Sequence, residues 1–184
     1  MSRFPRSFGR PRRLNALKFF AAVAAAVLFH FLGVRLIPHF SQVIDVFLVV
    51  AVLYGLEGNS LGALFAGMFV GLVHDSLSGG PFGLFGFADT IIAYGAARLA
   101  QRLVIQRATG VLALVSFATV AQQAIVVGLA LLLLPTPEVP NPVWVAIRAG
   151  ACGLLGLSIY IASAHWRRTS EARRRGRMSR LRLG

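Results

Sequence analysis

The chain has few charged side chains. Only 14% of its 184 residues are charged, whereas 57% are hydrophobic, and the mean hydropathy is +0.72. A soluble domain of this size carries about 25% charged residues. The chain therefore lacks the polar surface that a water-facing globule needs, and its composition indicates an all-α integral membrane protein.

Cysteine and recognisable chemical motifs are also scarce. The single cysteine, Cys152, excludes an intrachain disulfide, and its apolar surroundings predict an inert buried thiol. The pattern GxSxG occurs at 58–62, but it lies between two predicted helical spans and not at the strand-to-helix turn of a nucleophile elbow, and no phosphate-binding P-loop occurs. The four histidines lack the spacing of metal ligands: His30, His39, His74 and His165. We therefore expect no enzyme, no metal and no cofactor.

Acidic residues are few, and the basic ones are clustered. The sequence holds 19 Lys and Arg against six Asp and Glu, a net charge of +13. Six of the basic residues lie in 1–18 and eight in 167–184. The basic residues flank apolar segments, which favours the positive-inside rule over nucleic-acid binding, so we expect no nucleic-acid partner. Basic tails beside apolar spans instead indicate cytoplasmic segments that contact anionic lipid.

The apolar residues fall into six segments. A helix needs about 20 apolar residues to cross a bilayer. A loop with four prolines, 135–142, separates the last two segments. We predict six transmembrane helices at about 17–37, 42–57, 60–77, 82–101, 109–134 and 143–166.

Six spans place both termini on one side, together with the basic loop after the fourth span. That side then holds 17 basic residues, and the opposite half of the chain has an excess of acidic ones. The positive-inside rule makes the basic side the cytoplasm. We predict a bacterial inner-membrane protein with a basic tail (1–16), a six-helix domain (17–166) and an Arg-rich tail (167–184), both tails cytoplasmic.

The ionisable residues inside the spans share the outer half of the membrane. Asp89 and Arg148 lie at similar depth, roughly 8–11 Å from the outer surface, so we expect them to form an ion pair with His30 nearby. Unpaired, each would cost about 2–3 kcal/mol. The pair is either structural or part of a substrate or partner site. In the fifth span, at least one of Gln122 and Gln123 is expected to hydrogen-bond a neighbouring helix.

Glycines recur at helical spacing in two spans. Gly67 and Gly71 form a GxxxG motif, and three further glycines follow at every third residue: Gly150, Gly153 and Gly156. Such small residues let helices approach closely. The motif fits packing within the chain at least as well as dimerisation.

The most informative segment is 71–86, GLVHDSLSGGPFGLFG, which we call the signature turn. We expect Asp75 either to cap the following helix or to bind the amides of Gly79 and Gly80, and we expect the glycines to adopt positive φ. Pro81 suits the first position of the next helix. A partner-facing role stays open for the polar and glycine positions of this segment: Asp75, Ser78, Gly79, Gly80, Pro81 and Gly83.

The signature turn, running on to Ile91-Ile-Ala-Tyr94, resembles the MreD family of bacterial rod shape-determining membrane proteins. The resemblance is specific over about 62–100 and compositional elsewhere. It implies a scaffold of the rod complex, or elongasome, that binds the single-span protein MreC and supports lateral peptidoglycan synthesis. A SEDS-type glycan polymerase and a penicillin-binding transpeptidase would belong to the same complex. The resemblance also implies a fold similar to the substrate-binding subunits of energy-coupling-factor transporters.

Two other functions stay open. A substrate-binding subunit of a vitamin-type transporter would need aromatic and polar residues around one cavity and a ligand that co-purifies. An organiser of anionic lipid would act through the arginine tails, so deletion of the tails alone would abolish its function.

Overall fold

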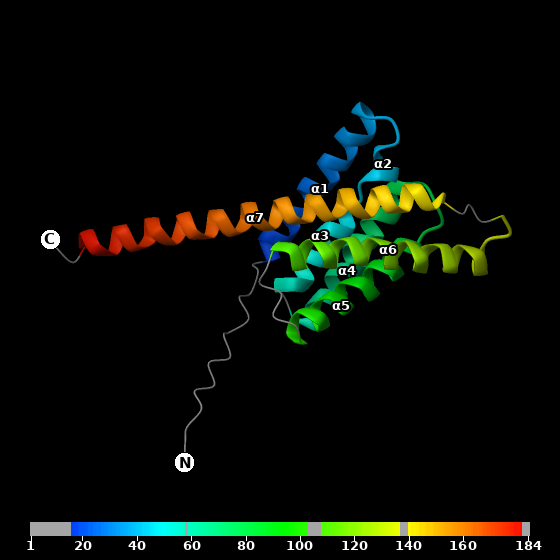
Figure 1. Ribbon diagram of the computed structural model, residues 1–184. Coiled ribbons are helices and arrows are strands. Elements are labelled where there is room, and N and C mark those ends of the chain that lie inside the picture. Colours follow the sequence, from blue (N-terminus) through cyan, green and yellow to red (C-terminus); the bar gives the residue numbers. More distant parts are fainter. Residues whose placement is uncertain (1–15, 58, 103–107, 137–139, 182–184) are drawn as a thin grey trace, which may run out of the picture.

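The computed structural model describes residues 16–57, 59–102, 108–136 and 140–181, with side chains as far as Trp166. The described residues form helices, turns and connecting segments without a strand, which confirms an all-α protein. The helices are arranged as a bundle from which the end of the last helix projects (Figure 1). Their bounds are α1 Ala16–Leu36, α2 Phe40–Val43, α3 Val46–Glu57, α4 Ser60–Ser78, α5 Leu84–Arg102, α6 Ala108–Leu133 and α7 Pro142–Leu181.

Five helical segments of the described chain are long and apolar enough to cross a membrane: Leu17–Leu36, Phe40–Glu57, Ser60–Ser78, Ala108–Leu133 and Pro142–Trp166. They agree with five of the predicted spans to within a few residues. The remaining predicted span, 82–101, does form a helix, α5, of 19 residues. It falls outside this group and carries three charged residues: Asp89, Arg98 and Arg102.

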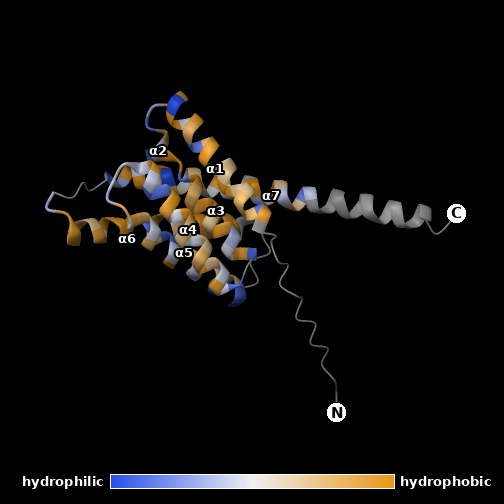
Figure 2. Ribbon diagram, turned by 180° about the vertical axis from the view of Figure 1, so that it is seen from behind, coloured by the Kyte–Doolittle hydropathy of each residue, from blue (hydrophilic) through white to orange (hydrophobic). Residues whose placement is uncertain are grey.

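The outer surface of the bundle is apolar. Figure 2 shows hydrophobic residues along most of the length of the helices in the bundle. Large side chains such as Phe31, Phe117 and Leu132 are exposed on α1 and α6. Monomeric soluble proteins rarely expose so large an apolar area. The exposed apolar surface and the five apolar segments together indicate a multi-pass membrane protein.

Helix α3 lies at the centre of the bundle. Five of its residues are fully buried: Phe47, Leu48, Val49, Ala51 and Val52. Phe47 and Ala51 pack in a cluster with residues of α1, α4 and α5, and the other three pack in a cluster with residues of α5, α6 and α7. Because α3 contacts nearly every other helix, a polar side chain at its start lies within reach of several elements.

Helices α4 and α5 form the most closely packed pair. A Cβ atom on Gly67 would lie 2.4 Å from the carbonyl oxygen of Asp89, and one on Gly71 would lie 2.5 Å from that of Phe85. Only glycine permits this backbone contact. The GxxxG motif therefore serves packing within the chain. This was one of the two predicted alternatives, the other being dimerisation.

The turn between α4 and α5 is built around two glycines. Gly79 ends α4 in the left-handed conformation (φ 68°), and Gly83 has φ 103°. They are the only described glycines with positive φ, so the expectation is confirmed at Gly79 and wrong at Gly80. The prediction for Pro81 is also wrong, because α5 begins three residues later, at Leu84. The extra turn lets the first amides of α5 face back toward α4.

Helices α6 and α7 pack less closely. Gly153 faces the Ser116 side chain and Gly156 faces Val115, whereas Gly150 has no neighbour within 4 Å of an added Cβ. The Ser116 hydroxyl donates to the Ala149 carbonyl at 3.0 Å. Contacts between these two helices are thus made mainly by side chains.

Candidate functional site

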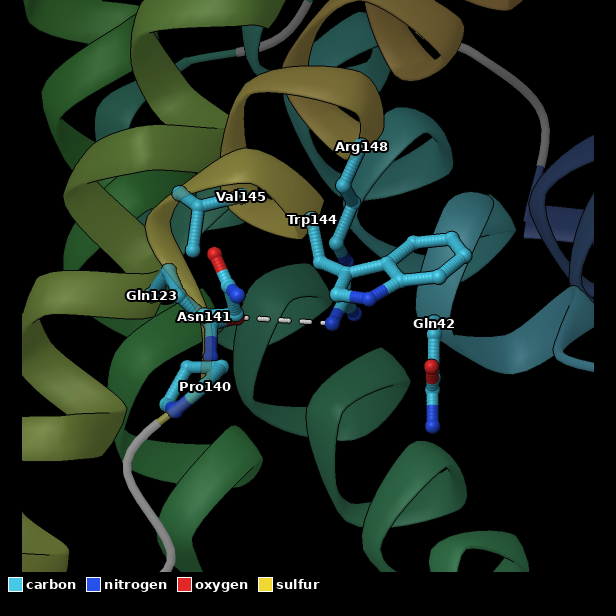
Figure 3. A pocket seen from close by; sticks show the side chains of 7 residues that line it. All are labelled: Gln42, Gln123, Pro140, Asn141, Trp144, Val145 and Arg148. Atoms are coloured by element: carbon cyan, nitrogen blue, oxygen red, sulfur yellow. Dashed lines mark hydrogen bonds between the residues drawn. The ribbon is translucent and has the colours of Figure 1, made fainter.

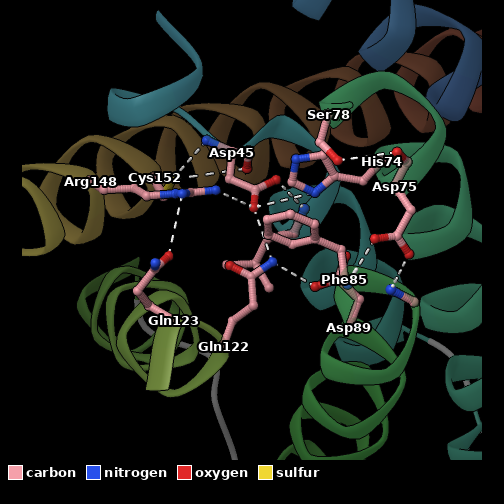
Figure 4. A network of polar contacts seen from close by, with 12 residues as sticks. Asp45, His74, Asp75, Ser78, Phe85, Asp89, Gln122, Gln123, Arg148 and Cys152 are labelled. Carbon is pink, nitrogen blue, oxygen red and sulfur yellow. Dashed lines mark hydrogen bonds and ion pairs between the residues drawn. The ribbon is translucent and has the colours of Figure 1, made fainter. Parts of the chain in front are cut away.

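Asp45 is the centre of a buried polar network (Figure 4). It lies in the break between α2 and α3, is 1% exposed, and begins α3 by accepting the Leu48 amide on Oδ1 at 3.0 Å. Its Oδ2 atom accepts the Arg148 guanidinium at 2.8 Å and the Gln122 amide at 3.0 Å. One carboxylate therefore joins α3 to α6 and α7.

Arg148 reaches this carboxylate from α7. The residue is 9% exposed; its Nη2 atom donates to Asp45, and its Nη1 atom donates to Oε1 of Gln123 at 3.3 Å. The charge is thus neutralised by a partner 103 positions earlier in the chain. A buried ion pair is more favourable when further hydrogen bonds satisfy its remaining donors and acceptors, and Gln122 and Gln123 supply two such bonds.

The predicted ion pair between Asp89 and Arg148 is wrong. Asp89, which is fully buried on α5, accepts the Gln122 side chain at 2.7 Å. The Gln122 Nε2 atom therefore donates to both carboxylates, Asp89 and Asp45. The prediction that a glutamine of this span bonds a neighbouring helix is confirmed, and Gln122 occupies the position that we had assigned to the arginine.

Two histidines lie on the other side of Asp45. The Nδ1 atom of His74 is 3.7 Å from Oδ2 of Asp45, and its ring packs on Phe85 with centroids 4.0 Å apart. The ring of His30 lies 6.2 Å from that of His74 and 5.3 Å from Phe47. His30 is thus a neighbour of His74, and not, as predicted, of an Asp89–Arg148 pair.

Asp75 points away from this centre and caps α5. Its two carboxylate oxygens accept the amides of Phe85 at 3.0 Å and Gly86 at 2.8 Å. Anionic caps are stabilising at a helix N-terminus, where amides lack partners. Ser78 donates to the Asp75 carbonyl at 3.1 Å. The capping alternative for Asp75 is therefore confirmed, and the role of Ser78 is local.

Cys152 is buried, as predicted. The Asp45 amide donates to its sulfur at 3.2 Å. The thiol therefore takes part in positioning the break before α3 and is enclosed within the network.

Several buried polar atoms of the network have no hydrogen-bond partner in the described part of the chain: Nδ1 of His30 and of His74, Oδ2 of Asp89, Oε1 of Gln122 and Nε of Arg148. Incomplete pairing of this kind is costly in a protein interior. The described residues contain no group of three or more His, Cys, Asp and Glu arranged to hold a metal ion. The arrangement is that of a hydrogen-bonding and ion-pairing centre.

A pocket of about 390 Å³ lies next to Arg148 (Figure 3). It opens where α7 begins, and its residues come from three helices and the segment before α7. Its described lining residues are Gln42, Gln123, Pro140, Asn141, Trp144, Val145 and Arg148. Of the residues predicted for a site, only Arg148 belongs to it. The residues of the signature turn lie elsewhere.

The central position of Asp45 could not be derived from the sequence. The available signals were a carboxylate close to a break in an apolar run and two adjacent glutamines in another span, but the sequence does not show that they meet.

Comparison of the chain with protein families, curated proteins and solved structures found no match.

Proposed function

We propose that this chain is a non-catalytic membrane scaffold of the type that the MreD resemblance implies, binding an MreC-like single-span partner in support of lateral peptidoglycan synthesis. The capped α4–α5 hairpin carries the proposal. Asp75 directs both oxygens to α5, and Gly67 and Gly71 are used in contact with α5. The residues of the signature turn thus build a rigid helical hairpin, and a scaffold needs rigid helix surfaces more than it needs reactive groups.

The apolar outer surface supports a helical partner. α1 exposes large side chains along much of its length, including Phe20, Phe29 and Phe31. A single-span partner would bind such a surface through van der Waals packing, because the hydrophobic effect is weak between helices in lipid. The resemblance further implies a SEDS polymerase and a penicillin-binding transpeptidase in the same complex. Anionic lipid would contact the basic tails, whose side chains beyond 166 and before 17 lie outside the described residues.

We infer that α5 also crosses the membrane, which brings the number of transmembrane helices to six. It has 19 residues, enough for about 28 Å of helix. Its acidic residue, Asp89, is fully buried and bonded to Gln122, so the helix does not present that charge to lipid. It returns along α4 after a five-residue turn. Six crossings put both termini in the cytoplasm of a bacterial inner membrane.

Reporter fusions test this topology. Alkaline phosphatase is active only outside the cytoplasm, and green fluorescent protein folds poorly there after export. We expect phosphatase activity for fusions at positions 80 and 137, and fluorescence for fusions at 105 and 184. If α5 does not cross, the fusions at 80 and 105 will report the same side.

Co-purification tests the scaffold function. The tagged chain would be co-expressed with an MreC-like protein and recovered from native membranes in a mild detergent, with an unrelated tagged six-span protein as control. Mass spectrometry is expected to find the MreC-like protein at near-stoichiometric amounts, with or without the polymerase and transpeptidase. Recovery of the chain alone from cells that express both proteins would contradict the proposal.

The pocket favours a second candidate function, the substrate-binding subunit of a small-molecule transporter. Aromatic and polar side chains, Trp144 and Gln123 among them, surround one cavity, as that function requires. It predicts a stoichiometric small molecule, or an ATPase-coupled membrane subunit, in the same purification. Finding either in place of an MreC-like protein would favour the transporter.

A further inference from the structure

We propose that the pocket beside Arg148 binds an oxyanion, a carboxylate or a phosphate group, through Arg148, Gln123, Asn141 and Trp144. The inference does not rest on the scaffold proposal. It concerns the end of the α6–α7 pair where α7 begins, whereas the scaffold proposal concerns the α4–α5 hairpin and the apolar surface.

The lining of the pocket suits an anion. The seven described lining residues include a guanidinium, three side-chain amides and an indole, and none of these seven is acidic. A guanidinium presents five N–H donors in one plane, an arrangement that matches carboxylate and phosphate oxygens. The amide groups of Gln42, Gln123 and Asn141 add donors around it. Glu138 lies outside the described residues and is therefore included in the test below.

Arg148 has donor capacity left over. Its Nη2 atom is engaged at 2.8 Å by Asp45, whereas the bond from Nη1 to Gln123 is long, at 3.3 Å, near the limit of a useful hydrogen bond. Its Nε atom is buried and has no partner among the described residues. Asp45 therefore holds the guanidinium in place, while the side that bonds Gln123 is the one that can exchange a weak partner for a stronger anionic one.

Trp144 forms an aromatic wall of the pocket. Its ring is held by a residue that does not line the pocket, His39. Its ring stacks on His39, with centroids 6.0 Å apart and planes 19° from parallel. His39 has φ 62°, the only positive φ among the described non-glycine residues, and this conformation is uncommon for a side chain-bearing residue. The unusual backbone brings the imidazole against the indole, which in turn lies beside Arg148 (Figure 3).

The oxyanion bound in the pocket can come from two sources, a lipid headgroup or a soluble anion. The pocket lies where α7 begins, next to the segment that joins α6 to α7. An anionic lipid headgroup could enter from the bilayer surface, and a small anion could enter from water. The experiment must therefore vary the lipid and the soluble anion separately.

Tryptophan fluorescence provides the measurement. The sequence holds two tryptophans, so Trp166→Phe leaves Trp144 as the only one. This full-length variant would be placed in nanodiscs of phosphatidylcholine and titrated with inorganic phosphate or acetate, with chloride at equal ionic strength as the control. A second set of nanodiscs would contain phosphatidylglycerol. A saturable change with phosphate or acetate assigns a soluble anion, and a change only with phosphatidylglycerol assigns a lipid headgroup.

Paired variants keep the result interpretable. Asp45→Asn combined with Arg148→Gln removes both charges of the buried pair, so folding is less at risk than with Arg148→Gln alone, and thermal unfolding checks it. We expect the double variant to bind about tenfold more weakly or worse. Arg98→Gln removes the same charge on α5 and is expected to leave the response unchanged, as is Glu138→Gln. The proposal is overturned if no lipid or anion gives a saturable response, or if the folded double variant responds like its parent.

Discussion

The α4–α5 and α6–α7 pairs are both antiparallel helical hairpins, but they are joined in different ways. In the first, glycines bring backbone against backbone and Asp75 closes the turn. In the second, a proline-rich segment connects the helices, side chains separate them, and a pocket remains where α7 begins. The comparison teaches that glycines facing a backbone bring two helices into direct contact, whereas glycines facing side chains leave the helices farther apart.

Loss of Arg148 should have the largest effect on the second hairpin. Arg148→Gln leaves the carboxylate of Asp45 buried without its counter-charge, and breaking a buried ion pair in this way costs about 3–5 kcal/mol. Unfolding in mixed micelles with increasing sodium dodecyl sulfate would measure the loss. Adding Asp45→Asn should restore most of the stability, because the charge that lacked a partner is then gone. A double variant as unstable as the single one would contradict this account.

The first hairpin should be broken next most severely by Gly71→Ala. The added Cβ would lie 2.5 Å from the Phe85 carbonyl oxygen and 2.7 Å from the Gly86 Cα, so the two backbones must separate, at a cost of about 1–3 kcal/mol. The same unfolding assay applies. Gly150→Ala is the matched control, since nothing lies within 4 Å of its Cβ. Equal effects at the two glycines would show that the close contact does not limit stability.

Removing the cap of α5 should cost somewhat less. Asp75→Ala leaves the amides of Phe85 and Gly86 without their acceptor, and loss of a helix cap costs about 0.5–2 kcal/mol. Asn141 caps α7 by accepting the Val143 amide at an exposed position. Asn141→Ala should therefore cost less stability, because water can replace the lost acceptor. The two variants would be compared by hydrogen exchange at the starts of α5 and α7. Faster exchange confined to α5 in Asp75→Ala is the expected result, and unchanged exchange there would argue against a capping role.

The smallest effect is expected at Gly153, and it tests most directly whether α6 and α7 meet through side chains. A Cβ on Gly153 would lie 2.3 Å from the Ser116 hydroxyl, and its next neighbour, the Leu112 carbonyl oxygen, is at 3.4 Å. Gly153→Ala should therefore be relieved by Ser116→Ala, which by itself removes one hydrogen bond worth about 0.6 kcal/mol. A double-mutant cycle on unfolding free energies would measure the rescue. Failure of Ser116→Ala to relieve Gly153→Ala would mean that α6 and α7 also meet through their backbones.

The sequence predicted the helices better than it predicted their contacts. Runs of apolar residues and breaks such as 135–142 placed five spans to within a few residues, because both signals are local. We predicted a pair between Asp89 and Arg148 because the two residues lie at similar depth. The prediction failed because depth gives no information about which face of its helix a residue occupies. Gln122 bonds Asp89 because α5 packs against α6 at that face, and Arg148 bonds Asp45 because α3 lies at the centre.

Turn chemistry was predictable in part. A carboxylate ten residues before the first turn of the next helix, with glycines between, indicated the cap at Asp75. Which glycines take positive φ depended on where α5 starts, and that is set by the contact of its backbone with α4. The pocket was beyond prediction, because it exists only where the start of α7, helix α2 and the side of α6 come together.

The two carboxylates bridged by Gln122 have a consequence for how the protein is made. Synthesis runs from the N-terminus, so Asp45 and Asp89 are made 77 and 33 positions ahead of Gln122, and Asp45 precedes Arg148 by 103. Of the side chains that contact these two carboxylates, His74 is made early, whereas Gln122 and Arg148 come last. The final packing of the network must therefore wait for α6 and α7.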